Sequence, residues 1–330
     1  MPDSEREALF AQVRGFMESR IVLTGVELGL FDLLRDQWRT ADEVARAVQG
    51  NLRGVTILLD ALTALGRLQK QNGRYQTAAP TARYLCSDSP DSILPIIQHY
   101  SGLWRRWSNL TDIVRGQRTY THADVTRTPE QLRAFIGGMH VLGRERAPLV
   151  VQQVNAADAR ALLDIGGASG TYTIAFLRAC PGMRATLFDL PEVIELARER
   201  LTEEALLDRV TLVAGDYNRD SFPPDHDLAF LSAIIHQNSH EQNVALYRRC
   251  FEALMPGGRI IIRDHVLSED RTTPRAGAIF AVNMLCGTEG GNSYTFGEIA
   301  GGLREAGFVD VRLLHQDSIM DGLVEARKPV

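Results

Sequence analysis

The sequence lacks the features that mark several large classes of protein. No stretch of about 18 uncharged apolar residues occurs, and the first residues lack the positive start and apolar centre of a signal peptide. Cysteines are few and widely separated, with no Cys-x-x-Cys pair, so neither a zinc cluster nor a disulfide framework is indicated. We therefore expect a cytoplasmic protein without a membrane segment. The four cysteines are Cys86, Cys180, Cys250 and Cys286.

Basic residues are also in short supply. The chain has 36 Lys and Arg against 41 Asp and Glu, a formal net charge of −5, whereas a nucleic-acid binder should carry a basic surplus on at least one domain. Hydrophobic residues at 45% and charged residues at 23% are ordinary for a globular protein. A length of 330 residues is sufficient for two domains. The composition thus predicts a globular protein that does not bind nucleic acid.

The first half of the chain shows helical periodicity with almost no buried-strand pattern. Thr40 and Glu43 form a capping box at the start of one helix, and Asn51 can cap the next. The Asn72-Gly73 dipeptide then favours a tight hairpin. Two helices followed by a hairpin predict a winged helix.

The second helix of this unit, residues 52–65, argues against a DNA-binding role for the winged helix. It offers only Arg53 as a cation and is otherwise dominated by Leu, Ile, Val and Ala. Such a helix is better suited to packing against another chain, and residues 21–34 would supply a further hydrophobic face. We predict a winged-helix-like dimerisation domain over residues 1–105 and a homodimer formed through it.

Beyond about residue 155, strands alternate with helices, which is the pattern of an α/β fold with a parallel sheet. We predict a doubly wound, Rossmann-like sheet over residues 155–330. Helices are expected to start after Gly170, Pro191, Ser239 and Thr295, and Pro256-Gly257-Gly258 is expected to separate a helix from the next strand. The strand candidates are residues 161–165, 185–188, 210–213, 228–231, 260–263 and 309–314, with a closing strand at residues 322–326.

A glycine-rich turn follows the first of these strands. In a doubly wound sheet this loop lies where ligands bind, and glycines there let the backbone approach a bound nucleoside. The turn has Gly166, Gly167 and Gly170, not the Gly-x-Gly-x-x-Gly of pyrophosphate binders, and Asp164 precedes it. This carboxylate would repel a pyrophosphate but suits a ligand with positive charge and hydrogen-bond donors. S-adenosylmethionine carries a sulfonium and an ammonium group, so we predict it as the cofactor and S-adenosylhomocysteine as its product.

Acidic residues also follow the second and third strands. Asp189 is placed to accept both hydroxyls of a ribose. Asp216 can accept a hydrogen bond from the adenine amine, and Tyr217 can cover the ring. An aspartate after a strand is often only a helix cap or a turn residue. Because three successive strand ends carry such residues, we favour a row of hydrogen-bond acceptors that binds an adenosine.

A histidine and a fourth acid complete the edge of the sheet. His236 follows the fourth strand, where a neutral imidazole would face the methyl group of the cofactor and can act as a general base. Asp264 follows the fifth strand and can hold the other ring nitrogen, fix the tautomer and stabilise the imidazolium. The alternative for Asp264 is a surface turn carboxylate.

The whole pattern resembles the class I S-adenosylmethionine-dependent O-methyltransferases of the caffeate and acetylserotonin (hydroxyindole) type. The resemblance rests on the glycine turn, Phe-Asp-Leu-Pro at 188–191, Gly-Asp at 215–216, the histidine after the fourth strand and the winged-helix half. It implies that Asp189, Leu190 and Pro191 form the ribose-binding turn. It further implies that His236 is the catalytic base and Asp264 its supporting acid. We also assign Ser232 to the cofactor site.

The same resemblance implies where the methyl acceptor binds. Linking helices over residues 106–154 and the segment around residues 276–293 would contribute to the acceptor pocket, which the partner subunit would cover. We predict O-methylation of a small aromatic hydroxyl compound there. The pocket candidates are Trp104, Met139, Asn283, Met284 and Thr288.

Two positions depart from the pattern of the family. The family commonly has His-Asp-Trp where this chain has His236-Gln237-Asn238, and Ser293 replaces a second acid. With one carboxylate beside the histidine, we expect a weaker base. For an acidic phenol, alignment alone can supply about 7 to 11 kcal/mol of the barrier reduction.

Other functions remain open from the sequence alone. His236, His240, His265 and Asp264 could hold a metal that chelates an α-keto acid and directs methylation to carbon, although we assign no metal site. A protein that keeps the cofactor without methylating is a third possibility, suggested by the missing second acid.

Overall fold

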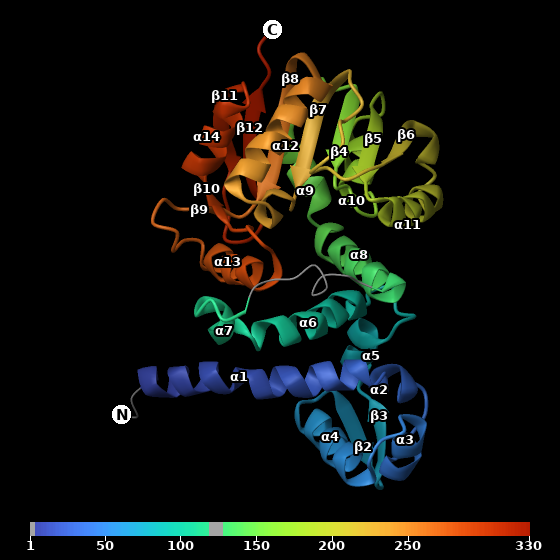
Figure 1. Cartoon of the computed structure of the whole chain (residues 1–330). Helices are drawn as coiled ribbons and strands as arrows, with labels where there is room; N and C mark the ends of the chain where they lie inside the picture. Colours follow the sequence, from blue (N-terminus) through green and yellow to red (C-terminus); the bar gives the residue numbers. More distant parts are fainter. Residues whose placement is uncertain (1–3, 119–127) are drawn as a thin grey trace. The chain divides into compact units, whose positions relative to one another are not determined.

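The computed structural model describes residues 4–118 and 128–330 of the chain. It forms two compact units, Met1–Trp104 and Arg105–Val330 (Figure 1). The boundary between the units falls inside helix α6 (Leu94–Trp107). Among the described residues, no helix combines the length and the apolar character needed to cross a membrane.

The first unit combines helices with a small antiparallel sheet of strand order β1-β3-β2. The predicted capping box is present, since the Thr40 hydroxyl accepts from the Glu43 N–H and the Glu43 carboxylate accepts from the Thr40 N–H. The Asn72-Gly73 turn also forms, with φ of 48° and 73°, values that favour these two residue types. The elements are α1 (Ser4–Glu27), α2 (Leu30–Leu33), β1 (Arg39–Thr40), α3 (Ala41–Ala47), α4 (Leu52–Ala64), β2 (Leu68–Gln71), β3 (Arg74–Thr77) and α5 (Ala79–Leu85).

Part of the apolar surface that was expected to meet another chain forms the core of this unit. Leu30 and Phe31, from the segment 21–34, and Leu59 and Leu62 of α4 are buried against one another in one cluster. Part of the predicted outward face is thus covered within the unit, because helical periodicity marks an apolar face without saying what covers it. Leu28, Leu52 and Ile57 of these segments remain exposed. A further group of exposed apolar residues lies in the first half of α1, namely Leu9, Phe10, Val13, Phe16 and Met17.

The second unit contains a seven-stranded sheet of order β11-β12-β8-β7-β4-β5-β6. Strands β8, β7, β4, β5 and β6 are parallel, and β12 runs antiparallel to both of its neighbours. The chain leaves β4 toward β5 and returns to β7 on the other side, so the predicted doubly wound sheet is confirmed. Its switch point lies between β4 and β7. The strands are β4 (Ala161–Ile165), β5 (Arg184–Asp189), β6 (Val210–Ala214), β7 (His226–Ser232), β8 (Leu254–Asp264), β11 (Val309–His315) and β12 (Gly322–Arg327).

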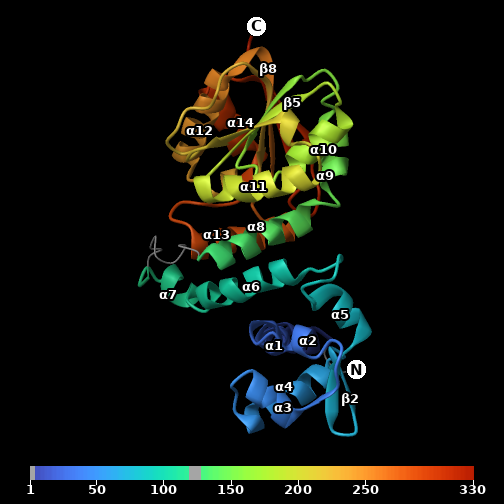
Figure 2. The same cartoon turned by 90° about the vertical axis from the view of Figure 1, so that its right-hand side faces the viewer.

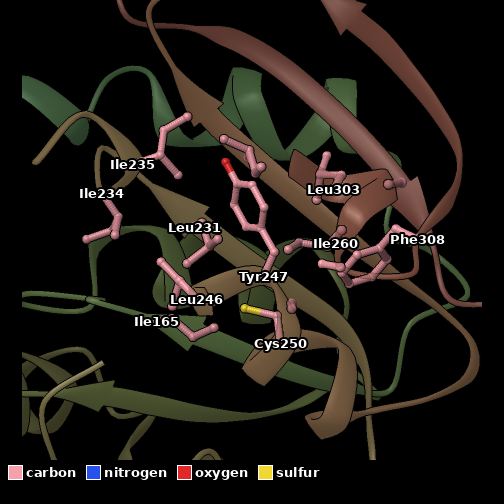
Figure 3. Packing of buried hydrophobic residues seen from close by; sticks show 14 of the residues in the cluster. Ile165, Leu231, Ile234, Ile235, Leu246, Tyr247, Cys250, Ile260, Leu303 and Phe308 are labelled. Carbon is pink, nitrogen blue, oxygen red and sulfur yellow. The ribbon is translucent and has the colours of Figure 1, made fainter. Parts of the chain in front are cut away.

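Helices cover both faces of this sheet. Residues of α12 and α14 pack in one cluster, and residues of α9, α10 and α11 pack in the other. Figure 2 shows α12 and α10 on opposite sides of the strands. Figure 3 shows the first cluster, where Tyr247 and Cys250 of α12 and Leu303 of α14 surround Ile260 of β8. The helices are α7 (Leu110–Val114), α8 (Pro129–Gly143), α9 (Ala147–Val154), α10 (Thr171–Ala179), α11 (Pro191–Glu203), α12 (His240–Ala253), α13 (Arg275–Gly287) and α14 (Phe296–Glu305).

Strand β8 begins earlier than predicted. The segment Pro256-Gly257-Gly258, expected to separate helix from strand, lies within β8. Gly257 has a φ of 77°, and its N–H donates to the carbonyl of Lys328. The tail of the chain therefore continues the pairing across a break that the local sequence marks as a stop. Two short strands, β9 (Val266–Leu267) and β10 (Tyr294–Thr295), were not predicted.

Candidate active site

The glycine turn after β4 is tightly packed. Gly166 has a φ of 67°, and a Cβ there would lie 2.3 Å from Cδ1 of Ile234 in the loop after β7. A Cβ on Gly167 would lie 2.7 Å from Leu187 and 3.0 Å from the Asp164 carboxylate. The turn therefore needs glycine both for its backbone conformation and because neighbouring side chains occupy the space. The contact with Ile234 also joins the turn to the loop that carries His236.

Asp164 lies beneath this turn and is 1% exposed. Its carboxylate accepts a hydrogen bond of 2.5 Å from the hydroxyl of Thr173 in α10. Burial is the largest influence on this group and raises its pKa to about 6, with a further increase from the nearby Asp189. The side chain thus ties the strand to the helix that follows the turn, a role that the sequence pattern does not indicate.

Asp189 closes the turn from the end of β5. One of its oxygens accepts from the N–H of Ala168 at 2.8 Å, and the other accepts from the N–H of Leu190 at 2.7 Å. Burial raises its pKa to about 6, although both hydrogen bonds act in the opposite direction. Each carboxylate oxygen has a second lone pair, so both can still accept from a ligand. Leu190 is exposed.

Asp216 and Tyr217 extend the row beyond β6. The Asp216 carboxylate accepts from the N–H of Asn218 at 2.9 Å, as in a turn-forming aspartate. Burial raises the pKa of Tyr217, and the charges of Asp189 and Asp216 raise it further. Asp189 thus influences both Asp164 and Tyr217, as expected for a row of residues along the carboxyl edge of the sheet.

Ser232, at the end of β7, belongs to a buried polar group that was not predicted. Its hydroxyl accepts from Nη1 of Arg263 in β8 at 3.2 Å. The same guanidinium donates to Asp321 from Nε at 2.8 Å and lies over the ring of Tyr172, 5.0 Å from its centroid. Arg146, just before α9, also pairs with Asp321. Ion pairs between residues far apart in sequence leave no local pattern.

His236 and Asp264 come together at the carboxyl ends of β7 and β8. Nδ1 of His236 lies 3.0 and 2.9 Å from the two oxygens of Asp264, and the two residues are 6% and 1% exposed. His236 lies in a short 3-10 turn, Ile235–Gln237. Because Nδ1–H donates to the carboxylate, the lone pair of the neutral ring is at Nε2. The phenyl ring of Phe280 in α13 packs edge-on against the imidazole, with centroids 4.8 Å apart.

The segment after α13 supports the turn that holds His236. Asn292 donates its N–H to the carbonyl of His236 at 2.9 Å, and a Cβ on Gly291 would lie 2.3 Å from that same oxygen. The amide of Asn238 donates to Asn243, and Tyr294 donates its hydroxyl to the carbonyl of Asn238. Asn238 is thus part of a buried hydrogen-bonded group at the position where we noted a departure from the family pattern.

Ser293 is buried, and its hydroxyl donates to the carbonyl of Gly277 at 2.9 Å. It fastens α13 to the following segment and supplies no charge. Phe280 and residues 290–292 lie in the segment predicted to line the acceptor pocket, but their contacts with His236 were not predicted, because these are packing relations across more than 40 residues.

The predicted pocket residues fall in different places. Asn283 accepts from Nε1 of Trp107 at 2.9 Å, and Met284 is buried, both in α13. The Thr288 hydroxyl donates to the Met284 carbonyl and accepts from the N–H of Gly291, so it is engaged in holding the turn. Met139 lies in α8. Trp104 belongs to the first unit, where its ring meets Phe16 of α1 at 6.3 Å and lies beside Arg20.

Metal chemistry finds no support in the arrangement of ligands. Within residues 4–118 and 128–330, no group of three or more His, Cys, Asp or Glu residues is placed to hold a metal ion. His240, which the metal hypothesis required, is the first residue of α12.

The edge of the sheet fits a cationic adenosine compound. Glycine backbone, the buried carboxylate of Asp164 and the half-buried carboxylate of Asp189 line the turn after β4. At the third strand end, a Cβ on Gly215 would lie 2.4 Å from Phe188. The fold and this edge together define an enzyme that binds a nucleoside donor at a switch point and holds a histidine–carboxylate pair beside it.

Comparison with known proteins identifies the family. Residues 107–309 match the O-methyltransferase domain, and residues 10–88 match the O-methyltransferase dimerisation domain. The chain belongs to the S-adenosylmethionine-dependent O-methyltransferases. The predicted cofactor and activity class are therefore confirmed, and the alternatives of metal-assisted C-methylation and cofactor binding without methylation gain no support.

Relatives with this architecture act on aromatic hydroxyl compounds according to their names. The chain is 31% identical over 311 residues to 3-hydroxy-5-methyl-1-naphthoate 3-O-methyltransferase of Streptomyces sahachiroi, covering 90% of this chain and 88% of that protein. It is 30% identical over 342 residues to acetylserotonin O-methyltransferase of Gallus gallus, covering 96% of each. The crystal structure of human N-acetylserotonin methyltransferase with S-adenosylmethionine matches with a TM-score of 0.84 at 25% identity, covering 100% of this chain and 99% of that one.

Proposed function

We propose that the enzyme methylates the hydroxyl group of a small aromatic compound and that His236 is the general base. The observation that carries the proposal is the buried pair of His236 and Asp264, with Nδ1 within 2.9 Å of the carboxylate. The pair lies beside the glycine turn, because Ile234 packs against Gly166 two residues before the histidine. A base and a nucleoside site at the same sheet edge suit transfer of a group to a hydroxyl.

Each site residue has a proposed role in cofactor binding, acceptor binding or proton transfer. When bound, the cofactor supplies a methyl group on a sulfonium. Asp164, Asp189 and the glycine backbone would hold it, with Asp216, Tyr217, Leu190 and Ser232 as further contacts. Nε2 of His236 takes the proton of the acceptor hydroxyl, and Asp264 keeps the ring in the required tautomer and stabilises the imidazolium. Asn283, Met284 and Met139 are the proposed acceptor contacts of the second unit.

The names of the relatives support an aromatic acceptor. The Streptomyces relative is named for a hydroxynaphthoate, and the Gallus relative is named for acetylserotonin. Both compounds carry a hydroxyl on a fused aromatic ring system, and a phenol of that kind is acidic enough for a base with a single supporting carboxylate.

The test is a screen of phenols with labelled S-adenosylmethionine, repeated on His236→Ala and Asp264→Asn. Loss of the base should lower turnover about 100- to 10,000-fold, since that is the usual contribution of general-base catalysis. Asp264→Asn should lower turnover in the same direction, because an amide can stabilise the wrong tautomer. The affinity for S-adenosylmethionine, measured by calorimetry, should stay the same in both variants.

His240→Gln is the matched control, since His240 lies four residues further on and, among the described residues, forms no hydrogen bond or ion pair with a carboxylate. It should keep the wild-type rate. Equal turnover in wild type and His236→Ala would remove His236 from the mechanism.

We also propose that two copies of the chain associate through α1. Residues 10–88 match a dimerisation domain, and the exposed apolar residues of α1 fall within or next to that range. Leu9, Val13 and Phe16 are 61%, 62% and 51% exposed and lie on one face of the helix. A second copy of the same helix is the occupant that would cover this face.

A further inference from the structure

His265 differs from the other histidines in the interior. His236 pairs with Asp264, His226 with the hydroxyl of Thr186 at 2.9 Å, and His140 with the hydroxyl of Thr171 at 2.9 Å. His265 is 5% exposed, yet neither ring nitrogen has a hydrogen-bond partner anywhere in residues 4–118 or 128–330, and Nδ1 is fully covered. An apolar side chain would fill this space without leaving polar atoms unpaired.

The backbone of His265 is fixed by the proposed catalytic pair. Its N–H donates to Oδ1 of Asp264 at 2.8 Å, the same oxygen that lies 3.0 Å from Nδ1 of His236. Asp264 therefore contacts the imidazole ring of His236 and the backbone N–H of His265.

The two imidazoles also share one aromatic neighbour. The ring of Phe280 lies 4.8 Å from the centroid of His236 and 4.9 Å from that of His265. Both imidazoles therefore pack against the same side chain of α13. The side chain of His265 also lies close to α13 at Gly277. A Cβ on Gly277 would lie 3.4 Å from Cβ of His265.

The charge state of His265 restricts what it can bind. Burial lowers the pKa of this imidazole, and the opposing effect of Asp264 is smaller. The ring is neutral near pH 7 and offers one donor and one acceptor. It suits an uncharged hydroxyl or carbonyl oxygen better than an ammonium group.

We propose that His265 is a specificity-determining residue that binds a second oxygen substituent on the aromatic acceptor, next to the hydroxyl that is methylated. This inference rests on the proposed function, and it narrows the acceptor to aromatic compounds with two neighbouring oxygen groups. Because Nδ1 is fully covered, Nε2 is the ring nitrogen that gains a partner when such an acceptor binds, whereas an acceptor with one hydroxyl leaves Nε2 without one.

The experiment measures acceptor binding to the protein loaded with S-adenosylhomocysteine, so that it does not depend on turnover. The probes are pairs that differ by one hydroxyl, namely phenol and catechol, 2-naphthol and 2,3-dihydroxynaphthalene, and 1-naphthol and 1,8-dihydroxynaphthalene. In at least one pair, wild type should bind the dihydroxy member about tenfold more tightly, the range expected for one buried hydrogen bond. This preference needs no variant to observe.

Two variants test the residue itself. His265→Phe keeps an aromatic ring beside Phe280 but removes both nitrogens, and the ratio of the two dissociation constants should fall to about 1. His265→Gln keeps a donor and an acceptor and should retain part of the preference, which also covers the case that His265→Phe fails to fold. His226→Gln, at the start of β7, is the control for loss of a buried histidine and should keep the wild-type ratio.

The inference is overturned if no pair shows the preference in wild type, or if His265→Phe keeps it. Wild type that binds none of the probes overturns it as well. If wild type prefers the dihydroxy probes but methylates none of them, the proposed function fails while the assignment of His265 stands.

Discussion

At the scale of single residues, the two carboxylates of the glycine turn have pKa values within the pH range in which the protein can be assayed. Burial raises the pKa of both Asp164 and Asp189 to about 6. Above that pH they are charged and can attract a cationic ligand and accept its hydrogen bonds. Below it they are protonated and lose both capacities.

We therefore expect the affinity for S-adenosylmethionine to weaken as the pH falls through about 6. The change should approach tenfold per pH unit for one coupled group, measured by calorimetry between pH 7.5 and 5. Asp189→Asn should bind more weakly at all pH values and with less dependence on pH. The exposed Asp208→Asn should behave as wild type. A dissociation constant that is unchanged between pH 7.5 and 5 would contradict this account.

The place of Asp189 at the edge of the sheet and the pairing of His236 with Asp264 could be predicted from sequence, because parallel strands bring successive strand ends to one edge. The hydrogen bond from Thr173 to Asp164 and the packing of Phe280 could not. The first needs the side-chain direction within a helix, and the second joins α13 to a turn that lies 44 residues earlier.

At the scale of elements, the loop after β4 and the loop after β7 are a single packed unit. Gly166 touches Ile234, which leads directly into the turn that carries His236. A change in the cofactor turn should consequently reach the catalytic histidine.

Gly166→Ala should weaken cofactor binding at least tenfold and lower turnover as well. The left-handed backbone costs a non-glycine residue roughly 1–2 kcal/mol, and the new Cβ would displace Ile234. The double variant Gly166→Ala/Ile234→Ala should recover part of the loss, because it removes the clashing side chain. Gly182→Ala is the control, since nothing lies within 4 Å of a Cβ there. Kinetics and calorimetry that show Gly166→Ala to be neutral would refute the coupling.

Elements with local signals were predicted well. The capping boxes at Thr40, Ser239 and Thr295 are all present, because each needs only four successive residues. The start of β8 was not predicted, because its first residues are hydrogen bonded to the end of the chain at Lys328. Strands β9 and β10 were not predicted, because a strand of two residues has no periodicity.

At the scale of the whole molecule, the exposed apolar face of α1 determines what is expected in solution. Wild type should sediment as a dimer of the 36.6 kDa chain. Val13→Glu places a charge on the apolar face and should shift the protein toward monomer, as measured by analytical ultracentrifugation. Ala11→Glu adds the same charge on the opposite face of the helix and should leave the dimer intact.

A monomeric wild type, or a dimer that persists in Val13→Glu, would show that this face of α1 is not the dimer interface. Sequence reasoning placed dimerisation in the first unit and did not single out the start of α1, whereas several of the apolar residues that it chose are buried within the unit. Both the covered and the uncovered helices of this unit carry apolar stripes, and only tertiary packing separates residues 21–34 from the start of α1.

The support of His236 by Gly291 and Asn292 bears on how the enzyme can acquire new acceptors. The segment 290–292 presses against the carbonyl of His236, so insertions or bulky replacements there would disturb the base as they reshaped the neighbouring surface. Among the described residues, no hydrogen bond joins helix α8 to His236. We therefore expect substitutions in α8 to change the range of methyl acceptors with less loss of turnover than substitutions in residues 290–292.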